Sequence, residues 1–536
     1  MEQRTLIAIT LSLLVLLAYN ALIPKPGFKP KKIYNSQDIA SKEDANIVVE
    51  SSSVQILNST AQSPSHELTP PALDILQHID TENLIFESTN IGGSLKSVTI
   101  KKYTHKLPIT NIINFIPHEN SVFQLSEITN GRIVYSFADK NFNILKTYQI
   151  IGDGGTIDAQ IKITNISNMS KLENIAVSNF IIKTSDITEQ SVPISDRSLY
   201  EYSVSKEDGI FRKNNAFSFS QRESTKKMSS VNWLGFRDRY YCAIIKPQFT
   251  ITSYSIEPVD SKDLKVSTHI DAVKIDPGEA VTYNFTAYFG LQDTDILRKH
   301  GHGFEEIISF SSFSVIDFIS KSIVKLMSLL HKIIPSWGLC IILMSAFVYL
   351  AMYPLTLKGM VSMKKMQLLQ PKIAQLREQY KNQPQKLNKE ITELYRENKV
   401  NPFSGCFPFI LQMPVFIGLY QALWRTVYLK GASFLWIKDL ASPDRLFVFS
   451  TALPLIGNEF NILPVVMAIV MFFQQKLSSK NIITADPAQI AQQKIMATIF
   501  PIMLGFIFYK FASGLTLYFT LFYLLSTITQ WKMSKV

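Results

Sequence analysis

The chain has 536 residues, of which 46% are hydrophobic and 18% are charged, and its net charge is +11. The charged fraction lies below the roughly 25% that is usual for soluble proteins, and the positive charge indicates nucleic-acid binding only if it covers a whole surface. The three cysteines are far apart in sequence, which argues against a disulfide framework, and His300 and His302 have no third metal ligand nearby. We therefore expect no metal and no cofactor.

The N-terminal segment predicts a membrane anchor followed by a linker. Residues 5–23 follow a short polar stretch and are almost all apolar. A run of this length can cross a bilayer. A cleavable signal peptide is the alternative, but the end of the run lacks a good small-x-small cleavage pattern. Residues 25–70 are polar and show no apolar period, which predicts a flexible linker.

Residues 71–312 change character and predict a large exported β-sandwich. Short stretches rich in Val, Ile, Tyr, Phe and Thr alternate apolar with polar positions between turn signals, for example at 95–103, 156–164 and 280–289. A segment of this size can bury its own core. Residues 313–336 then place apolar side chains at helical spacing with lysines between them, which predicts a helix in the membrane interface. A soluble helix packed on the β-domain is the alternative.

The rest of the chain predicts a helical membrane domain. Residues 337–357 are uncharged, residues 358–402 are strongly basic, and 403–536 contains four further apolar stretches. Together with the anchor these make six transmembrane helices, whereas the apolar stretch at 446–457 is short and predicts an interfacial loop element. The predicted organisation is an anchor at 1–24, a linker at 25–70, a β-sandwich domain at 71–312, an interfacial helix at 313–336, a second span at 337–357, a basic helical hairpin at 358–402, and spans three to six at 403–536.

The distribution of basic residues predicts the orientation. Residues 358–399 hold eight Lys and two Arg against four Glu, so the positive-inside rule places this loop in the cytoplasm and the β-domain in the periplasm. The first span has the opposite bias, with Arg4 on its inner side and four lysines on its outer side. We expect a multi-pass protein of the bacterial inner membrane, with an inverted first span as the alternative.

Several motifs, in a fixed order along the chain, carry a family resemblance. They are MYPLT at 352–356, LQPK at 369–372, KVNPFSGCFPFILQMP at 399–414, FLWIKDL at 434–440, MFFQQK at 471–476, QKIM at 493–496 and SGLTLY at 513–518, with GGSLKSV at 92–98 and WLGFRDRYY at 233–241 in the β-domain. The chain resembles the YidC/Oxa/Albino family of membrane insertases over nearly its whole length. The resemblance implies a non-enzymatic protein that inserts and helps fold membrane proteins, alone or with the Sec translocon.

The resemblance also implies a polar groove open to the cytoplasm and to lipid, with five spans forming the insertase core. Its expected partners are nascent membrane proteins, the Sec translocon, the ribosome and membrane lipids, with no small-molecule substrate. Moving an unpaired peptide group through hydrocarbon costs several kcal/mol, so a hydrated groove needs inward-facing polar side chains. The candidate groove residues are Ser345, Tyr349, Gln412, Tyr420, Thr516, Thr520, Tyr523 and Thr527. In the last span the steps of four, three, four and three residues from Thr516 to Gln530 predict one polar stripe along a helix.

Each candidate set has a simpler structural alternative. Ser and Thr in membrane helices often bond the carbonyls of their own helix and help helices pack. An apolar slide for the incoming segment is predicted at Met413, Phe416, Ile417, Leu504, Phe506 and Phe508, which would otherwise face lipid or pack inside the bundle. Cytoplasmic contacts are predicted at Lys364, Lys365, Lys372, Arg377 and Lys381, which could equally form a solvated basic face.

One position departs from the family pattern. Family members commonly carry an arginine four residues before the Tyr-Pro pair of the second span, and Tyr349 occupies that position here. No Lys or Arg occurs between Trp337 and Leu357. We therefore expect a polar but uncharged groove, and an insertion reaction that depends less on attraction to acidic residues of the substrate.

Two other function classes are compatible with the composition. A transporter or channel usually shows internal symmetry or a coupling charge at mid-span, and neither is visible. A glycan-binding β-sandwich held by membrane spans would not account for motifs concentrated in the spans. Hydrolase, protease and nucleotide-binding motifs are missing from the sequence.

Overall fold

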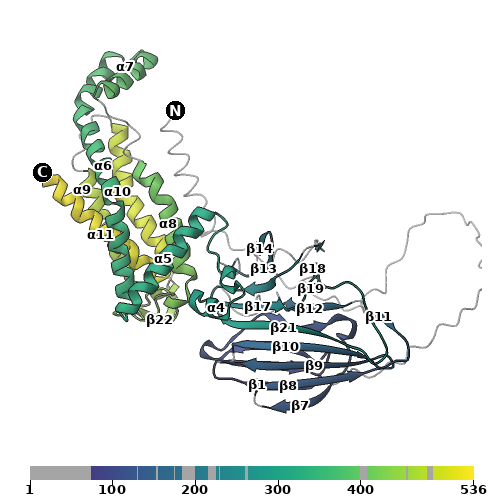
Figure 1. The fold of residues 1–536 in the computed structure, drawn as a ribbon. Helices are drawn as coiled ribbons and strands as arrows, with labels where there is room; N and C mark the ends of the chain where they lie inside the picture. Colours follow the sequence, from purple (N-terminus) through teal and green to yellow (C-terminus); the bar gives the residue numbers. More distant parts are fainter. Residues whose placement is uncertain are drawn as a thin grey trace, which may run out of the picture. The chain divides into compact units, whose positions relative to one another are not determined.

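The computed structural model describes residues 74–535 except 130, 153–154, 174, 184–198, 215–224, 229, 260–262, 399–406, 454–456 and 480–486. The predicted anchor at 1–24 and linker at 25–70 lie outside these residues. Within them the chain forms a β-rich domain followed by a group of helices (Figure 1). The predicted β-rich domain and helical C-terminal part are thus confirmed.

The β-domain is built from antiparallel sheets that share one apolar core. The largest sheet has nine strands in the spatial order β14 (Gly209–Asn214), β13 (Glu201–Lys206), β16 (Trp233–Arg237), β17 (Tyr241–Pro247), β21 (Ala280–Leu291), β10 (Thr156–Asn165), β9 (Phe142–Ile151), β8 (Arg132–Ala138) and β7 (Gln124–Thr129). The second has six, β15 (Thr225–Met228), β18 (Ser253–Pro258), β19 (Leu264–His269), β12 (Ala176–Ile182) and β5 (Ile109–Thr110) in order, with β6 (Asn114–Phe115) also on β12.

Smaller sheets complete the domain. A four-stranded sheet has the order β1 (Leu76–Asp80), β2 (Leu84–Thr89), β3 (Ser94–Ile100) and β4 (His105–Lys106), and β11 (Lys171–Glu173) pairs with β20 (Val273–Ile275).

Along β9 alternate residues are buried, as expected for a strand with one face on the core. Lys146 occupies one of these buried positions, where its ammonium group donates hydrogen bonds to Gly92 O at 2.6 Å and Asn114 Oδ1 at 3.1 Å.

Two helices follow the last strand of the β-domain. The short α4 (Thr294–His300) is capped by Asp293, whose carboxylate accepts hydrogen bonds from two backbone amides of its first turn. The longer α5 (Ser314–Ile333) covers most of the predicted interfacial helix, and it packs against a later helix, α8 (Phe407–Arg425). Ser320 Oγ donates a hydrogen bond of 2.8 Å to Gly418 O, where a Cβ on Gly418 would lie 2.7 Å from Ile319 Cγ2. This close approach requires glycine at residue 418.

The helical part contains α6 (Trp337–Gln379), α7 (Pro384–Glu397), α8, α9 (Leu463–Ser479), α10 (Pro487–Phe508) and α11 (Ser513–Lys535). In Figure 1, α6 and α8 to α11 form one bundle and α7 lies beyond its end. Among the described residues, one segment, Trp337–Gly359, is long and apolar enough to cross a membrane, and Leu463–Leu477 and Ala497–Phe508 are shorter apolar helices. The predicted number of six membrane crossings therefore stays a prediction.

The basic segment forms a helical hairpin with α6. The second span and the first arm of the hairpin are one helix of 43 residues that continues through Pro354 and Pro371. Leu369 and Ile373 on α6 are buried against Ile391 and Leu394 of α7, so the two arms run antiparallel. An unbroken α6 was not predicted, because prolines usually end or bend a helix.

The described residues of the apolar stretch at 446–457 form strands rather than a loop. Strands β22 (Phe447–Leu453) and β23 (Gly457–Phe460) make an antiparallel hairpin. Gly457 has φ of +83°, a conformation that glycine adopts without strain, and the preceding residues favour strand formation. The prediction of an interfacial loop element is corrected in this respect.

Candidate functional site

Tyr349 connects α6 to the C-terminal half of α11. Its hydroxyl donates a hydrogen bond of 2.7 Å to Thr529 Oγ1, and its ring meets the Phe522 ring edge-on at a centroid distance of 5.7 Å. Only 7% of the tyrosine is exposed. The position at which an arginine was expected is thus occupied by a neutral side chain that holds two helices together.

The predicted hydroxyl groups bond their own helices. Ser345 Oγ donates to Ile341 O at 2.6 Å, Thr520 Oγ1 to Thr516 O at 2.8 Å, and Thr527 Oγ1 to Tyr523 O at 2.7 Å. Thr516 is buried and donates in the same way to Ala512 O at 3.3 Å. These bonds satisfy each hydroxyl proton locally, while the oxygen lone pairs remain available as acceptors.

The structure separates Tyr349 from the predicted polar stripe of α11. With 3.6 residues per turn, Thr529 lies roughly 140° around α11 from the stripe formed by Thr516, Thr520, Tyr523 and Thr527. Tyr349 therefore faces a different side of α11, together with Phe522. The contact between α6 and α11 and the predicted stripe are two separate faces of one helix.

Some buried polar atoms of the bundle have no hydrogen-bond partner within the described part of the chain. They are Gln421 Oε1, Gln474 Oε1, Tyr518 OH and Gln530 Oε1. Buried polar groups are nearly always paired in folded proteins, so each of these atoms marks a place for water or another polar group. Gln474 and Gln530 lie in the C-terminal halves of α9 and α11, two helices that pack side by side.

Aromatic side chains link α8 to the turn between α10 and α11. Phe416 lies 4.9 Å from Phe519, Phe508 lies 5.1 Å from Phe519, and Tyr420 meets Phe511 edge-on at 5.8 Å between ring centroids. This cluster fills the space between the three helices with apolar rings. Phe508, predicted to lie on the apolar slide, is 6% exposed and belongs to this cluster instead.

The other predicted slide residues are partly exposed. Met413 is 40% exposed and Phe506 is 53% exposed, whereas Leu504, Ile417 and Phe416 are half-buried. Gln412 precedes Met413 on α8 and is also half-buried. The exposed surfaces of α8 and α10 thus carry apolar side chains, and the polar amide of Gln412 lies beside them in sequence.

Acidic side chains fix the connection between α8 and α9. Asp444 Oδ2 accepts hydrogen bonds from the Ile462 and Leu463 backbone amides at 2.9 and 3.1 Å, at the start of α9. Asp439 Oδ1 accepts from the backbone amides of Gly431 and Ala441, both at 2.9 Å. Because backbone donors in this connection are paired with buried or half-buried carboxylates, the loop is held in one arrangement at that end of the bundle.

The basic hairpin presents its cations to solvent. Lys365, Lys372 and Lys381 are exposed and Arg377 is half-buried, whereas the side chain of Lys364 is outside the described residues. Lys386 on α7 lies 5.0 Å from the Tyr380 ring centroid, beside the loop between the two arms. The tip of the hairpin therefore carries accessible positive charge.

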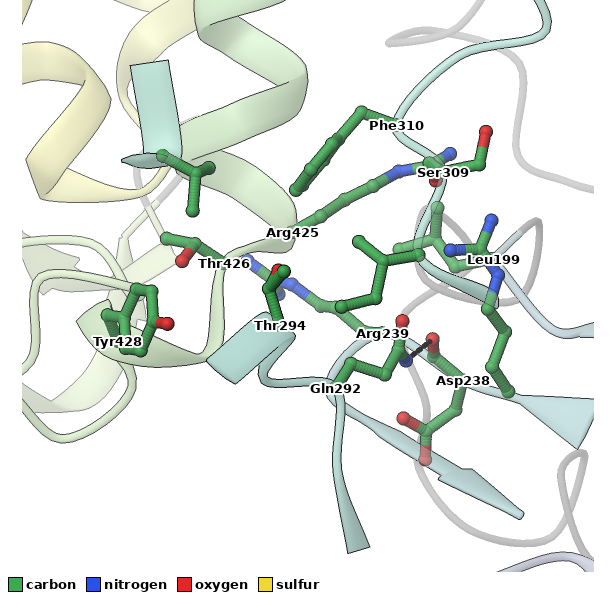
Figure 2. A pocket seen from close by; sticks show the side chains of 13 residues that line it. Leu199, Asp238, Arg239, Gln292, Thr294, Ser309, Phe310, Arg425, Thr426 and Tyr428 are labelled. Atoms are coloured by element: carbon green, nitrogen blue, oxygen red, sulfur yellow. Dashed lines mark hydrogen bonds between the residues drawn. The ribbon is translucent and has the colours of Figure 1, made fainter. Parts of the chain in front are cut away.

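A second cluster joins the β-domain to the end of α8. Arg239 Nε donates a hydrogen bond of 2.8 Å to Trp424 O, and Arg425 Nη1 donates one of 3.1 Å to Ser309 O. Figure 2 shows Arg425, Arg239 and Gln292 among the side chains around one small cavity, and the Gln292 amide donates to Asp238 O at 2.8 Å. These contacts are made largely by guanidinium groups and backbone carbonyls.

Lys430 is enclosed by tyrosines of the β-domain. Its ammonium nitrogen lies 4.2 Å from the ring centroid of Tyr103, 4.7 Å from that of Tyr240 and 4.9 Å from that of Tyr241. It also donates a hydrogen bond of 3.3 Å to the Tyr241 hydroxyl. Burial lowers the pKa of Lys430, and the nearby Asp238 carboxylate opposes that change. We call Lys430 and these three tyrosines the lysine cage.

The described residues contain no group of three or more His, Cys, Asp and Glu side chains that could hold a metal ion. His300 Nδ1 lies 3.2 Å from Thr156 Oγ1, and His302 Nδ1 lies 2.8 Å from Lys246 Nζ, so the two histidines make separate contacts.

Comparison with known proteins decides the family. The family model described as "60Kd inner membrane protein" matches residues 329–536, and the model described as "YidC periplasmic domain" matches residues 114–326. The chain belongs to the YidC family. Membrane protein insertase YidC of Pelobacter propionicus is 29% identical over 567 residues, covering 100% of this chain and 99% of that protein.

Two further relatives extend the comparison. Membrane protein insertase YidC of Syntrophus aciditrophicus is 29% identical over 575 residues and is covered over its full length. A solved structure described as an active YidC insertase with its first transmembrane domain resolved is 16% identical, covers 85% of this chain and 94% of its own, and has a TM-score of 0.38.

The structure points to candidate residues that the sequence analysis missed. Thr529 and Tyr518 on α11 and Gln421 on α8 do not belong to the predicted groove set, yet one bonds Tyr349 and the others carry buried unpaired oxygens. Tyr518 ends the SGLTLY motif at 513–518, so its place in a recurring motif was the available signal. Thr529 and Gln421 had no signal of this kind.

Proposed function

We propose that this protein inserts integral membrane proteins into the bacterial inner membrane and helps them fold. In this proposal the incoming chain rests its polar part against polar side chains of the bundle, while its apolar segment moves along exposed apolar residues of α8 and α10. The reaction needs no nucleotide and no cofactor, because the driving force is the transfer of apolar side chains from water into lipid.

One observation carries the groove proposal: the apolar bundle contains buried polar oxygens that have no hydrogen-bond partner among the described residues. Gln474 Oε1 and Gln530 Oε1 lie on neighbouring helices, α9 and α11, towards the end from which α6 extends into the basic hairpin. Such atoms favour water in the bundle, and a hydrated surface reduces the cost of bringing a polar segment into the membrane. The half-buried Gln412 on α8 supports the same proposal.

The surfaces at the two ends of the bundle support the proposed orientation. The exposed lysines of the hairpin fit a cytoplasmic location, since short basic loops stay inside. They also fit contact with the ribosome, whose RNA is acidic, or with the Sec translocon. The β-domain would then lie in the periplasm, joined to the bundle by the lysine cage and by Arg239 and Arg425.

Site-specific crosslinking tests this proposal. Photoreactive residues at 349, 412 and 506 are introduced one at a time into the full chain, and a stalled nascent membrane protein is presented to membrane vesicles. The matched control is the same residue at Lys274, which is exposed on the β-domain. We expect crosslinks from 412 and 506 and none from 274. Loss of all crosslinks from the three bundle sites would contradict the groove.

A second measurement separates insertion from transport. Vesicles containing the purified protein are tested in parallel for insertion of a single-span substrate and for leakage of a small solute. Insertion without leakage is expected, because the aromatic cluster of Phe416, Phe508 and Phe519 fills the space between α8, α10 and α11. Solute leakage without insertion would favour a channel.

A further inference from the structure

A large cleft lies where the β-domain, the start of α5 and the end of α8 meet. Its volume is about 1010 Å³, at the upper end of the range of roughly 300–1,000 Å³ that is common for ligand sites. Strand β14 contributes Arg212 and Lys213, α5 contributes Phe318 and Lys321, and α8 contributes Arg425. Three separate parts of the chain therefore form one concave surface.

The cleft is positively charged. Five cationic side chains and two carboxylates line it. The carboxylates are engaged: Glu201 accepts two hydrogen bonds from Arg237, at 3.0 and 2.9 Å, and Asp317 forms an ion pair of 2.9 Å with Lys321. The lining thus has three more positive than negative side chains, so the cleft attracts anions.

Polar atoms at the wall of this cleft lack partners. The Arg212 guanidinium donates from Nη2 to Glu306 O and forms an ion pair of 3.7 Å with Glu201, whereas its buried Nε has no hydrogen-bond acceptor among the described residues. Arg425 Nε and Gln421 Oε1 are also buried and unpaired within the described part of the chain. Two unpaired guanidinium donors fit an oxyanion such as a phosphate, which accepts from arginine with high geometric specificity.

The rim of the cleft is apolar and exposed. Phe313 is 73% exposed and Phe318 is 72% exposed, and both belong to the cleft lining. Val315 and Leu329 continue an exposed apolar face along α5, while Lys321 and Lys325 form a basic face beside it. A soluble anion would gain nothing from the phenylalanines, whereas a lipid would place its acyl chains against them and its phosphate between the arginines.

We propose that this cleft binds the phosphate headgroup of an anionic phospholipid, with Arg212, Lys213 and Arg425 facing the phosphate and Phe313 and Phe318 facing the acyl chains. The lipid would come from the leaflet next to α5. A bound lipid would fill the space between the β-domain and the bundle, adding to the contacts made by Arg239 and the lysine cage.

Native mass spectrometry of the full-length protein tests the proposal. Delipidated protein in neutral detergent is mixed with phosphatidylglycerol or phosphatidylcholine of the same acyl chains, and bound lipid is counted. The variant Arg212→Gln/Lys213→Gln is compared with Lys140→Gln/Lys162→Gln, which removes two exposed lysines of the β-domain outside the cleft. We expect retention of phosphatidylglycerol to fall roughly tenfold in Arg212→Gln/Lys213→Gln and to stay unchanged in Lys140→Gln/Lys162→Gln.

Two further measurements distinguish a lipid headgroup from free phosphate as the bound anion. Phe313→Ser/Phe318→Ser should also lower phosphatidylglycerol retention, and millimolar inorganic phosphate should not displace the lipid from the unmodified protein. If the double arginine–lysine variant does not fold, Lys321→Gln at the exposed rim gives the same test with a smaller effect. Equal retention of both lipids, equal loss in the control pair, or full displacement by phosphate with no effect of the phenylalanine substitutions would overturn the proposal.

Discussion

The hydroxyl of Tyr349 on α6 donates a hydrogen bond of 2.7 Å to Thr529 Oγ1 on α11, across 180 positions of sequence. The ring of the same tyrosine packs edge-on against Phe522, so one side chain provides both a polar and an apolar contact between the two helices. A charged side chain at this position would have to leave both contacts or bring its charge into an apolar neighbourhood.

Removing the hydroxyl should weaken the pairing of α6 and α11 by a modest amount. Tyr349→Phe keeps the ring and loses the hydrogen bond, so we expect a loss of about 0.5–1.5 kcal/mol in the free energy of unfolding. The melting temperature of the detergent-purified protein should fall by about 1–4 °C. Tyr353→Phe, one turn away with no hydrogen bond to a described residue, is the matched control.

A double-mutant cycle sharpens this prediction. Thr529→Val removes the acceptor, and the double variant Tyr349→Phe/Thr529→Val should be about as stable as the less stable single variant. Strictly additive effects of the two substitutions would contradict a direct bond between these side chains.

Introducing the family arginine should change which substrates are favoured. We expect Tyr349→Arg to increase insertion of a substrate with an acidic translocated tail relative to one with a neutral tail, because the guanidinium adds a positive charge in a low-dielectric region. Insertion of the two substrates into vesicles is the measurement, and Tyr349→Gln controls for polarity without charge. The same ratio of acidic to neutral insertion in all three proteins would show that charge at 349 does not select substrates.

The lysine cage should contribute measurably to stability. Lys430→Met keeps the length of the side chain and loses the interaction of its charge with Tyr103, Tyr240 and Tyr241, at an expected cost of about 1–2 kcal/mol. The melting temperature should fall by about 2–8 °C. Lys438→Met, an exposed lysine eight residues further on, is the control and should behave like the unmodified protein. Equal melting temperatures for both variants would show that the lysine cage does not stabilise the protein.

The buried Lys146 should make the stability of the β-domain depend on pH. Burial lowers the pKa of its ammonium group to about 7, whereas the unfolded value is about 10.4. Between about pH 7 and 10 the unfolded state binds one more proton at this site, so the free energy of unfolding rises with pH by about 1.4 kcal/mol per pH unit from this group.

The measurement is the melting temperature from pH 7 to 9.5 for the unmodified protein, Lys146→Met and Lys162→Met. Lys162 is an exposed lysine on β10 and should follow the unmodified protein. The melting temperature of the unmodified protein should rise relative to that of Lys146→Met as the pH increases. A constant difference across this range would mean that Lys146 is already protonated in the folded state.

Sequence periodicity predicted the elements better than it predicted their contacts. The strands of the β-domain, the helix at 313–336 and the two arms of the basic hairpin each repeat an apolar period that belongs to one type of secondary structure. Lys146 shows the limit of this reasoning: the alternation along β9 places it on the core side, while its residue type predicts the surface.

The candidate site shows a second limit. Helical spacing grouped the threonines of α11 correctly on one face, but it does not reveal which neighbour that face meets. Tyr349 contacts Thr529 and Phe522 on another face, because the rotation of α11 in the bundle is set by the packing of all its neighbours. Phe508 was assigned to an outer surface for the same reason, although the turn after α10 brings it against Phe519.

The unbroken helix α6 connects the tip of the hairpin mechanically to the bundle. Its 43 residues span about 65 Å, roughly twice the thickness of a bilayer's hydrocarbon core. A displacement of the loop between α6 and α7 therefore acts on one end of a helix whose other half lies inside the bundle. Pro354 and Pro371 interrupt its backbone hydrogen bonds and are where it bends most easily. Because Tyr349 lies on the same continuous helix, a force applied at the tip of the hairpin is transmitted to its contact with Thr529.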